Sequence, residues 1–328
     1  MDKNISLLED RREYSKDRLD QLRRRIANIK ELELFPKITI YCAGSYARLE
    51  ASQYSDIDMF FLYSATPNEL EEPKTSQIRF FSKIIEVIED MNFPKLSNDG
   101  EFLKLSHTGD LIDDLGSRDD DYKNHFTARM LLLLESQCIY QEQIYNDAIK
   151  KVIESYFRDY PGHESSFRPT FLVNDIMRYW KTLCLNYENK RNKPTGDNEK
   201  RIKQKVKNFK LKFSRMNTCF TMIAGLLCQK SIIDQELIYR LVKQTPMERL
   251  DIASSFIPEA GDLLDELREQ YSWFLQLTGL PTIDLHERFN NDEFRHDAFE
   301  KANEYGDSMF QLLQLIDKKN NYLRYLVI

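Results

Sequence analysis

Two aspartates, Asp56 and Asp58, stand one residue apart just before an apolar run, Met59–Tyr63. The run predicts a strand, and side chains in a strand alternate between two faces, so both carboxylates should point to the same side. Burying two like charges side by side is costly unless another group compensates them. Divalent cations relieve that cost, because Mg²⁺ takes carboxylate oxygens as ligands. The pair therefore predicts a metal site for Mg²⁺, with Mn²⁺ as the alternative.

A glycine–serine pair, Gly44-Ser45, precedes the aspartates and follows another candidate strand, Ile38–Ala43. That segment alternates β-branched and aromatic residues, a pattern typical of a buried strand. A glycine turn that leads into a helix start presents backbone N–H groups suited to a phosphate. Gly44 and Ser45 are therefore predicted to bind phosphate groups.

The segment Ile38–Ser64 contains these features in a fixed order: Gly44-Ser45, then Arg48 and Glu50, then Ser55–Asp58. Together they resemble the signature of the DNA polymerase β-like nucleotidyltransferase superfamily. The segment is similar to its counterparts in minimal nucleotidyltransferases, kanamycin nucleotidyltransferase and the uridylyl- and adenylyltransferases of nitrogen signalling. The resemblance extends loosely over the first 120 residues.

The resemblance implies an α+β fold, with a small mixed β-sheet core flanked by helices and followed by an all-helical C-terminal domain. It implies that Gly44 and Ser45 hold the β- and γ-phosphates, while Asp56 and Asp58 are catalytic metal ligands. It also implies a third carboxylate on a neighbouring strand. Glu101, at the start of a short strand candidate, is the residue expected to fill that position. Arg48 and Glu50 are expected to brace the turn by pairing with one another.

The length of 328 residues predicts two domains. By the resemblance, these are a catalytic core over residues 1–120 and a helical bundle over residues 121–328. Apolar periodicity predicts helices over these segments: 4–34, 78–91, 126–140, 145–156, 171–187, 217–229, 234–243, 262–277 and 296–316. Residues 108–121 are rich in aspartate, which favours a solvated loop over a second metal site.

The net charge of −6 argues against a protein that coats nucleic acid over its whole surface. The charged N-terminal segment does not resemble a secretory signal, and no apolar run is long enough to span a bilayer. The five cysteines are widely spaced, without a C-x-x-C pair, which favours reduced, buried thiols. We therefore expect a cytoplasmic protein with no membrane partner. The sequence does not indicate its oligomeric state.

A strongly basic segment, Lys190–Arg215, contains only two acidic residues. It is either a solvated surface or a patch that holds the phosphates of an RNA or DNA acceptor. Aromatic and basic residues interleave at its C-terminal end. The resemblance implies that four residues at this end contact the triphosphate of a nucleotide: Lys210, Lys212, Ser214 and Arg215.

The expected function is Mg²⁺-dependent transfer of an NMP group from an NTP, with ATP as the default donor, to a hydroxyl of a protein or RNA, with release of pyrophosphate. One alternative is an enzyme that makes an oligonucleotide or cyclic-nucleotide signal. Another is a nucleotide-binding or interaction protein whose catalysis is impaired. This alternative stays open because the segment around Glu101 lacks the clear apolar–Asp–apolar pattern expected for the third carboxylate.

Overall fold

The computed structural model describes residues 3–64, 74–94, 103–164, 167–192, 196–229 and 233–320. The chain divides into two compact units. The sheet unit is Glu9–Arg158, and the helical unit comprises Met1–Leu8 and Asp159–Ile328. The domain boundary expected at residue 120 falls inside the sheet unit, and the expected pair of domains stays a prediction.

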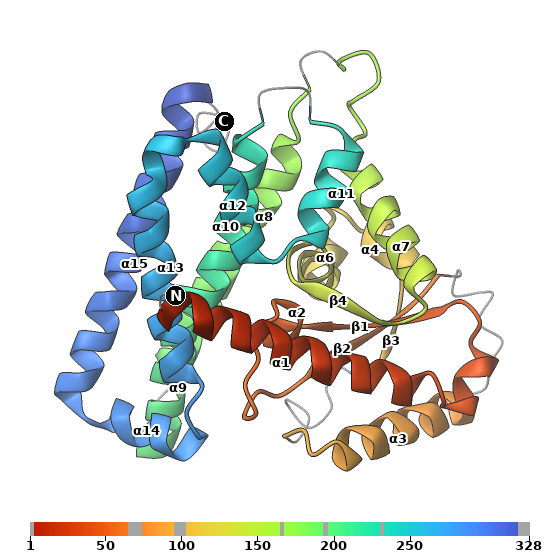
Figure 1. Ribbon diagram of the computed structural model, residues 1–328. Coiled ribbons are helices and arrows are strands. Elements are labelled where there is room, and N and C mark those ends of the chain that lie inside the picture. The colour runs from red at the N-terminus through yellow and green to blue at the C-terminus, as the bar shows by residue number, and fades with distance from the viewer. Residues whose placement is uncertain are drawn as a thin grey trace. The chain divides into compact units, whose positions relative to one another are not determined.

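The sheet unit is built on a four-stranded sheet in the order β3-β2-β1-β4 (Figure 1). The central strand β1 (Ile38–Ala43) is buried at every residue and pairs antiparallel with β2 (Asp58–Tyr63) and with β4 (Ser136–Tyr140). β3 (Leu105–His107) runs parallel to β2 at one edge. The sheet is thus mixed, and together with its helices and the long helical region after it this confirms the predicted α+β class.

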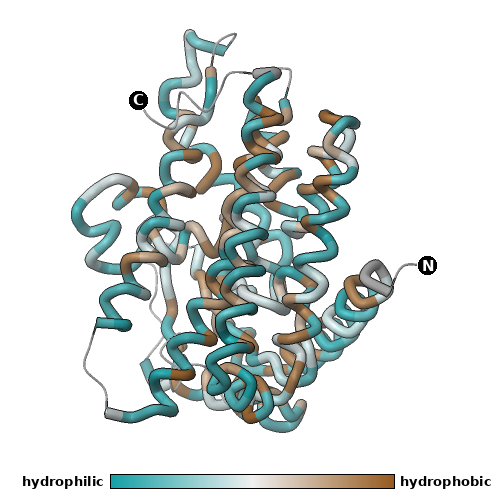
Figure 2. The backbone as a smooth tube through the Cα atoms, turned by 90° about the vertical axis from the view of Figure 1, so that its left-hand side faces the viewer, coloured by the Kyte–Doolittle hydropathy of each residue, from teal (hydrophilic) through white to brown (hydrophobic). Residues whose placement is uncertain are grey.

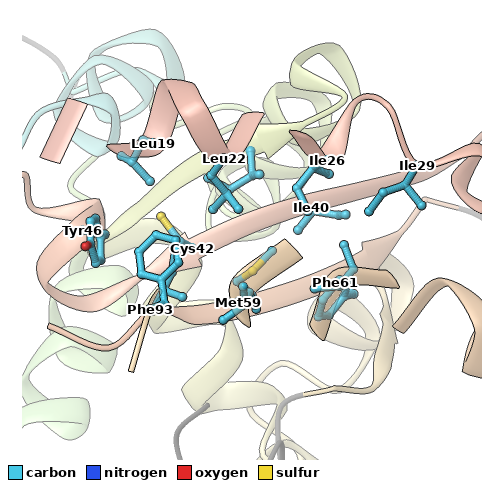
Figure 3. Packing of buried hydrophobic residues seen from close by; sticks show 14 of the residues in the cluster. Leu19, Leu22, Ile26, Ile29, Ile40, Cys42, Tyr46, Met59, Phe61 and Phe93 are labelled. Atoms are coloured by element: carbon cyan, nitrogen blue, oxygen red, sulfur yellow. The ribbon is translucent and has the colours of Figure 1, made fainter. Parts of the chain in front are cut away.

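One face of the sheet packs on α1 (Lys3–Ile26), the 3₁₀ turn η1 (Lys30–Leu34) and α3 (Lys74–Asp90). Figure 3 shows side chains of α1 directed at alternate residues of β1 and β2, and the labelled members of this cluster include Leu22, Ile26, Ile40, Cys42, Met59 and Phe61. Each such side chain contributes roughly 1.5–3 kcal/mol when it is fully buried. Because Met59 and Phe61 face this core, the alternate residues Asp58, Phe60 and Leu62 face the opposite side of β2.

The helices on the other side of the strands are α4 (Thr108–Asp113), α6 (His125–Leu134) and α7 (Glu142–Ser155) (Figure 1), and α5 (Arg118–Tyr122) packs on α6. A fully buried ion pair joins α5 and α6. Arg129 of α6 binds both carboxylate oxygens of Asp120 of α5, at 2.9 and 2.6 Å, and also donates to the Leu111 carbonyl. Residues 108–121 therefore form two short helices rather than the predicted loop, and Asp120 is an ion-pair partner.

Within its described residues, the helical unit contains helices throughout. Their bounds are α8 (Thr170–Arg191), α9 (Asn198–Lys210), the π-helical turn η4 (Leu211–Arg215), α10 (Met216–Leu227), α11 (Gln235–Lys243), α12 (Pro246–Phe256), the 3₁₀ turn η5 (Pro258–Ala260), α13 (Gly261–Thr278), α14 (Thr282–Asn290) and α15 (Asp292–Asn320). α10 is buried along almost its whole length and packs on α8, α12 and α15. Hydrophobic and hydrophilic stretches alternate along the long helices (Figure 2), as expected for a bundle with one core-facing side per helix.

Two of the predicted helices need correction. The helix predicted over residues 126–140 was wrong beyond Leu134, because Ser136–Tyr140 pairs with β1 as strand β4. The helix predicted over 4–34 ends at Ile26, and η1 follows it. The other helices predicted from periodicity are confirmed, with ends shifted by a few residues.

The five cysteines all lie in the described ranges, and none of them forms a disulfide. Cys42, Cys219 and Cys228 are buried as predicted, whereas Cys138 and Cys184 are half-buried. Among the helices that the structure describes, none combines the length and the apolar character that a membrane span requires.

Candidate active site

The chain turns sharply where β1 ends. Gly44 has φ of +75°, in the left-handed region that favours glycine, and begins the single helical turn α2 (Gly44–Ala47). The amide of Arg48 donates to the Gly44 carbonyl at 3.0 Å, and the amide of Glu50 donates to the Ser45 carbonyl at 2.9 Å. The predicted glycine turn leading into a helix start is therefore confirmed.

Strand pairing brings Asp58 to this turn. Ala43, the last residue of β1, stands opposite Asp58, the first residue of β2. A Cβ atom added at Gly44 would lie 3.5 Å from Oδ2 of Asp58. The predicted phosphate-binding turn and one predicted metal ligand are thus adjacent, although 14 positions separate them in the sequence.

The two aspartates follow the alternation expected from their spacing. Ile57 between them is buried in the core cluster at 1% exposure, while Asp56 is exposed and Asp58 is half-buried. Regular strand pairing starts only at Asp58, so Asp56 lies just before β2 rather than within it. The pattern directs both carboxylates away from the core beneath the sheet.

A buried network of ion pairs stabilises the residues that follow the turn. Arg48 donates from Nε to Glu50 Oε2 at 2.8 Å and from its terminal guanidinium nitrogen to Glu135 Oε2 at 2.5 Å. All three side chains are at most 7% exposed. The predicted pairing of Arg48 with Glu50 is confirmed, and the network ties the residues after α2 to the start of β4.

Sequence reasoning missed Glu135. It is the only acidic residue in the apolar segment 126–140, and a lone acid in such a segment needs a buried partner. That signal was available, but its partner Arg48 lies 87 positions away, so only the folded chain identifies the pair.

Cys42 is excluded as a nucleophile beside this turn. Its side chain belongs to the core cluster on the α1 face of the sheet, and burial raises the pKa of its thiol to about 12. The thiolate form, which is the reactive one, is therefore scarce near neutral pH.

The third carboxylate is not placed. Glu101 lies outside the described residues, and within the described part of the chain no group of three or more His, Cys, Asp or Glu side chains is arranged to hold a metal. His107 stands opposite Tyr63, at the end of β2 remote from Asp58. Five residues of strand separate the two positions, roughly 16 Å, so His107 is no substitute for the third acid.

The residues predicted to contact the triphosphate from the helical domain lie in the helical unit, around a π-helical turn. Lys210 ends α9, and η4 contains Lys212, Ser214 and Arg215 within one helix that runs without a break from α9 into α10. The Ser214 hydroxyl donates to the Lys210 carbonyl at 2.9 Å, and Lys212 Nζ donates to Asn303 Oδ1 at 2.8 Å. Single π turns within α-helices occur frequently at functional sites, but nucleotide contact by these residues stays a prediction.

The basic segment forms one side of an amphipathic helix. In α9, Ile202, Val206 and Phe209 are buried. The exposed cationic residues of that helix are Lys200, Arg201, Lys203, Lys207 and Lys210. The predicted cationic face therefore exists on α9, while Lys205 is only half-exposed.

Residues 22–108 match the family model described as "Nucleotidyltransferase domain". The match covers β1, α2, β2 and β3, and so includes Gly44, Ser45, Asp56 and Asp58, whereas Glu135 and the helical unit lie beyond it. Comparisons with curated proteins and with solved structures returned no match. Residues 22–108 are a nucleotidyltransferase domain of the DNA polymerase β-like superfamily.

Proposed function

We propose that the protein transfers an NMP group from an NTP, with ATP as the donor, to a hydroxyl group on RNA or protein in a metal-dependent reaction. The nucleotidyltransferase domain supports nucleotidyl transfer as the general reaction. The observation that carries the proposal is the proximity of the Gly44 turn to the Asp58 carboxylate, whose Oδ2 lies 3.5 Å from the position that a Cβ on residue 44 would take. A phosphate held at the turn would lie beside a carboxylate, and a cation is needed to offset their repulsion.

The residues present fit a divalent metal ion. Asp56 and Asp58 offer hard oxygen donors directed away from the core, and the absence of a side chain at Gly44 leaves space beside Asp58 Oδ2. Asp56 and Asp58 would hold Mg²⁺ or Mn²⁺, with Glu101 as the proposed third ligand. When bound, such an ion neutralises phosphate charge and lowers the pKa of an attacking hydroxyl.

In the proposed reaction, the acceptor hydroxyl oxygen attacks the α-phosphorus of the NTP. A new oxygen–phosphorus bond forms, the bond to the bridging oxygen breaks, pyrophosphate leaves, and the hydroxyl proton passes to solvent. Gly44 and Ser45 would bind the departing β- and γ-phosphates through backbone N–H groups. Lys210, Lys212, Ser214 and Arg215 are proposed as further nucleotide contacts. Catalysis would rest mainly on positioning and charge neutralisation.

The exposed cationic face of α9 favours RNA over protein as the acceptor. Five cationic side chains along one helix suit a polyphosphate backbone, because each neutralised phosphate releases counterions. The positive charge of this face is partly offset at its N-terminal end, where Lys200 Nζ lies 3.7 Å from Asp197 Oδ2.

The experiment that tests the proposal is incubation with ATP labelled at the α-phosphate and Mg²⁺, with and without cell RNA or cell protein. Label in RNA or in protein supports the proposal and identifies the acceptor class. A labelled small product made without an acceptor would instead support a nucleotide-signal synthase. ATP binding without any turnover would support a protein that has lost catalysis.

A further inference from the structure

A pocket of about 270 Å³ opens in the sheet unit between β2, β3 and the beginning of α6. Its walls include Phe60, Leu62, Ser106, Asn124, His125 and Ala128. Part of the lining is apolar and part consists of hydrogen-bonding groups. Its size is close to the lower end of the range for sites that bind small organic ligands.

The pocket lies on the face of β2 that carries Asp58. Alternation along the strand directs Asp58, Phe60 and Leu62 to one face, while Met59 and Phe61 contribute to the core on the other. Phe60 stacks on Tyr41 of β1 with ring centroids 5.4 Å apart and planes inclined by 13°, which fixes its ring at the pocket wall.

Asp58 stands between the pocket and the glycine turn. Since Ala43 pairs with Asp58 in an antiparallel register, Gly44 lies beyond the start of β2, whereas Phe60 and Leu62 lie in the opposite direction. In an in-line displacement, the attacking and leaving oxygens are on opposite sides of the phosphorus. If pyrophosphate departs at the Gly44 turn, the acceptor approaches from the side of Phe60.

The length of this path suits one nucleoside. Two residues of strand separate Asp58 from Phe60, about 7 Å, which is comparable with the distance from the base to the ribose hydroxyl of a nucleoside. A base stacked on Phe60 would therefore present its ribose hydroxyl toward Asp58.

The lining also suits a nucleoside. Phe60 supplies an aromatic face, and Ser106, Asn124 and Asp110 supply hydrogen-bond donors and acceptors for base edges. Two basic side chains in the wall already have acidic partners: His125 Nδ1 lies 2.8 Å from Asp114 Oδ2, and Lys123 Nζ lies 2.9 Å from Asp119 Oδ2. The carboxylates of Asp114 and Asp119 beside these side chains repel a further anion, which favours a base and ribose over a polyphosphate as the occupant.

We propose that this pocket binds the acceptor nucleoside, whose ribose hydroxyl receives the NMP group. The inference rests on the proposed function and extends it to the acceptor. The nucleoside is either the 3′-terminal residue of an RNA or part of a free nucleotide. Both present the same base and ribose to Phe60.

Nucleoside binding measured without a divalent cation distinguishes this pocket from the donor site, because only the donor site is proposed to need the metal. Calorimetric titration in EDTA with the four nucleoside monophosphates, and separately with short single-stranded RNA, tests the two sources of the nucleoside. Ala128→Trp fills the pocket with a bulky side chain and should weaken binding at least about tenfold, as should Phe60→Leu, which removes the stacking ring but keeps an apolar strand residue. Ala27→Trp, at an exposed residue after α1, is the matched control and should bind as the wild type does.

The inference is overturned if neither probe binds the wild-type protein, or if folded Ala128→Trp and Phe60→Leu proteins both bind with wild-type affinity. Circular dichroism establishes that each variant is folded. One further outcome would overturn the proposed function but not the nucleoside site. If labelled ATP gives no transfer to any acceptor while Ala128→Trp still abolishes nucleoside binding, the proposed function fails and the nucleoside site remains.

Discussion

Gly44 and Asp58 meet at the end of the central strand pair, where a side chain on residue 44 would have its Cβ 3.5 Å from Oδ2 of Asp58. Glycine at this position combines two properties. It adopts φ of +75° without strain, and it leaves the approach to the carboxylate open. The following predictions test this relationship and the residues around it.

Gly44→Val should abolish detectable NTP binding, because a β-branched residue resists positive φ and crowds Asp58. Gly162→Val is a matched control: Gly162 also has positive φ, +84°, but a Cβ there would meet no atom within 4 Å. Titration calorimetry with ATP and Mg²⁺ measures both proteins. If folded Gly44→Val binds ATP as tightly as Gly162→Val, the turn does not hold phosphate.

Asp58→Ala should reduce nucleotidyl transfer to background while the protein stays folded, since it removes a metal ligand and relieves repulsion with Asp56. Chelation of divalent ions by EDTA should have the same effect on the wild type, reversed by excess Mg²⁺ or Mn²⁺. Asp90→Ala, which alters an exposed carboxylate at the end of α3, serves as the control. Transfer by Asp58→Ala at the Asp90→Ala rate would contradict the assignment of a metal ligand.

Arg48→Met should destabilise the sheet unit by about 3–5 kcal/mol, because it leaves Glu50 and Glu135 buried without their shared cation. Urea denaturation measures the change in the free energy of unfolding. Lys83→Met breaks a salt bridge of 2.7 Å between exposed side chains on α3 and should have little effect. Equal stability of the two variants would show that the network does not brace the turn.

Cys42, Cys219 and Cys228 should resist alkylation by iodoacetamide at pH 8 in the native protein. Burial raises the pKa of each of these thiols to about 12, so almost none is ionised at that pH. Cys138 and Cys184 are half-buried and should react first. Peptide mass spectrometry identifies the modified residues, with protein in urea as the fully reactive control. Alkylation of Cys42 at the rate seen in urea would contradict its placement in the core.

Replacing Lys200, Lys203 and Lys207 by Gln should weaken RNA binding and flatten its salt dependence. The logarithm of affinity falls with the logarithm of salt concentration by about 0.7 per phosphate contact on a single strand, so loss of three contacts should reduce the slope by about 2. Three exposed lysines of the sheet unit, Lys16, Lys30 and Lys150, provide a charge-matched control when changed to Gln.

The same measurements separate the α9 face from the η4 residues. Replacing Lys210 and Arg215 by Gln should raise the KM for ATP with little change in the RNA salt slope, if those side chains contact the nucleotide. Should neither set of changes alter either quantity, α9 and η4 present a solvated surface, and a protein acceptor becomes the better hypothesis.

Much of the fold was predictable because its signals are local. The alternation in Ile38–Ala43, the glycine that follows it and the spacing of Asp56 and Asp58 each depend on residues close in sequence, and each recurs in the structure. Most helices were predicted for the same reason, since a helix buries one side at a period of 3.6 residues. The helix predicted over residues 126–140 was wrong for its last residues because a buried strand and a buried helix are both apolar on all sides. Only pairing with β1 identifies Ser136–Tyr140 as a strand.

The sequence by itself determined the parts of the candidate site: a glycine turn, two aspartates on one side of an extended segment, and an arginine and a glutamate that pair two residues apart. The tertiary structure alone decided which of these parts meet. The register of β1 against β2 brought Asp58 to Gly44, and the addition of β4 brought Glu135 to Arg48. The physical reason is that backbone propensity and side-chain alternation act over a few residues, whereas strand register and the compensation of buried charge depend on segments that come together only in the folded chain.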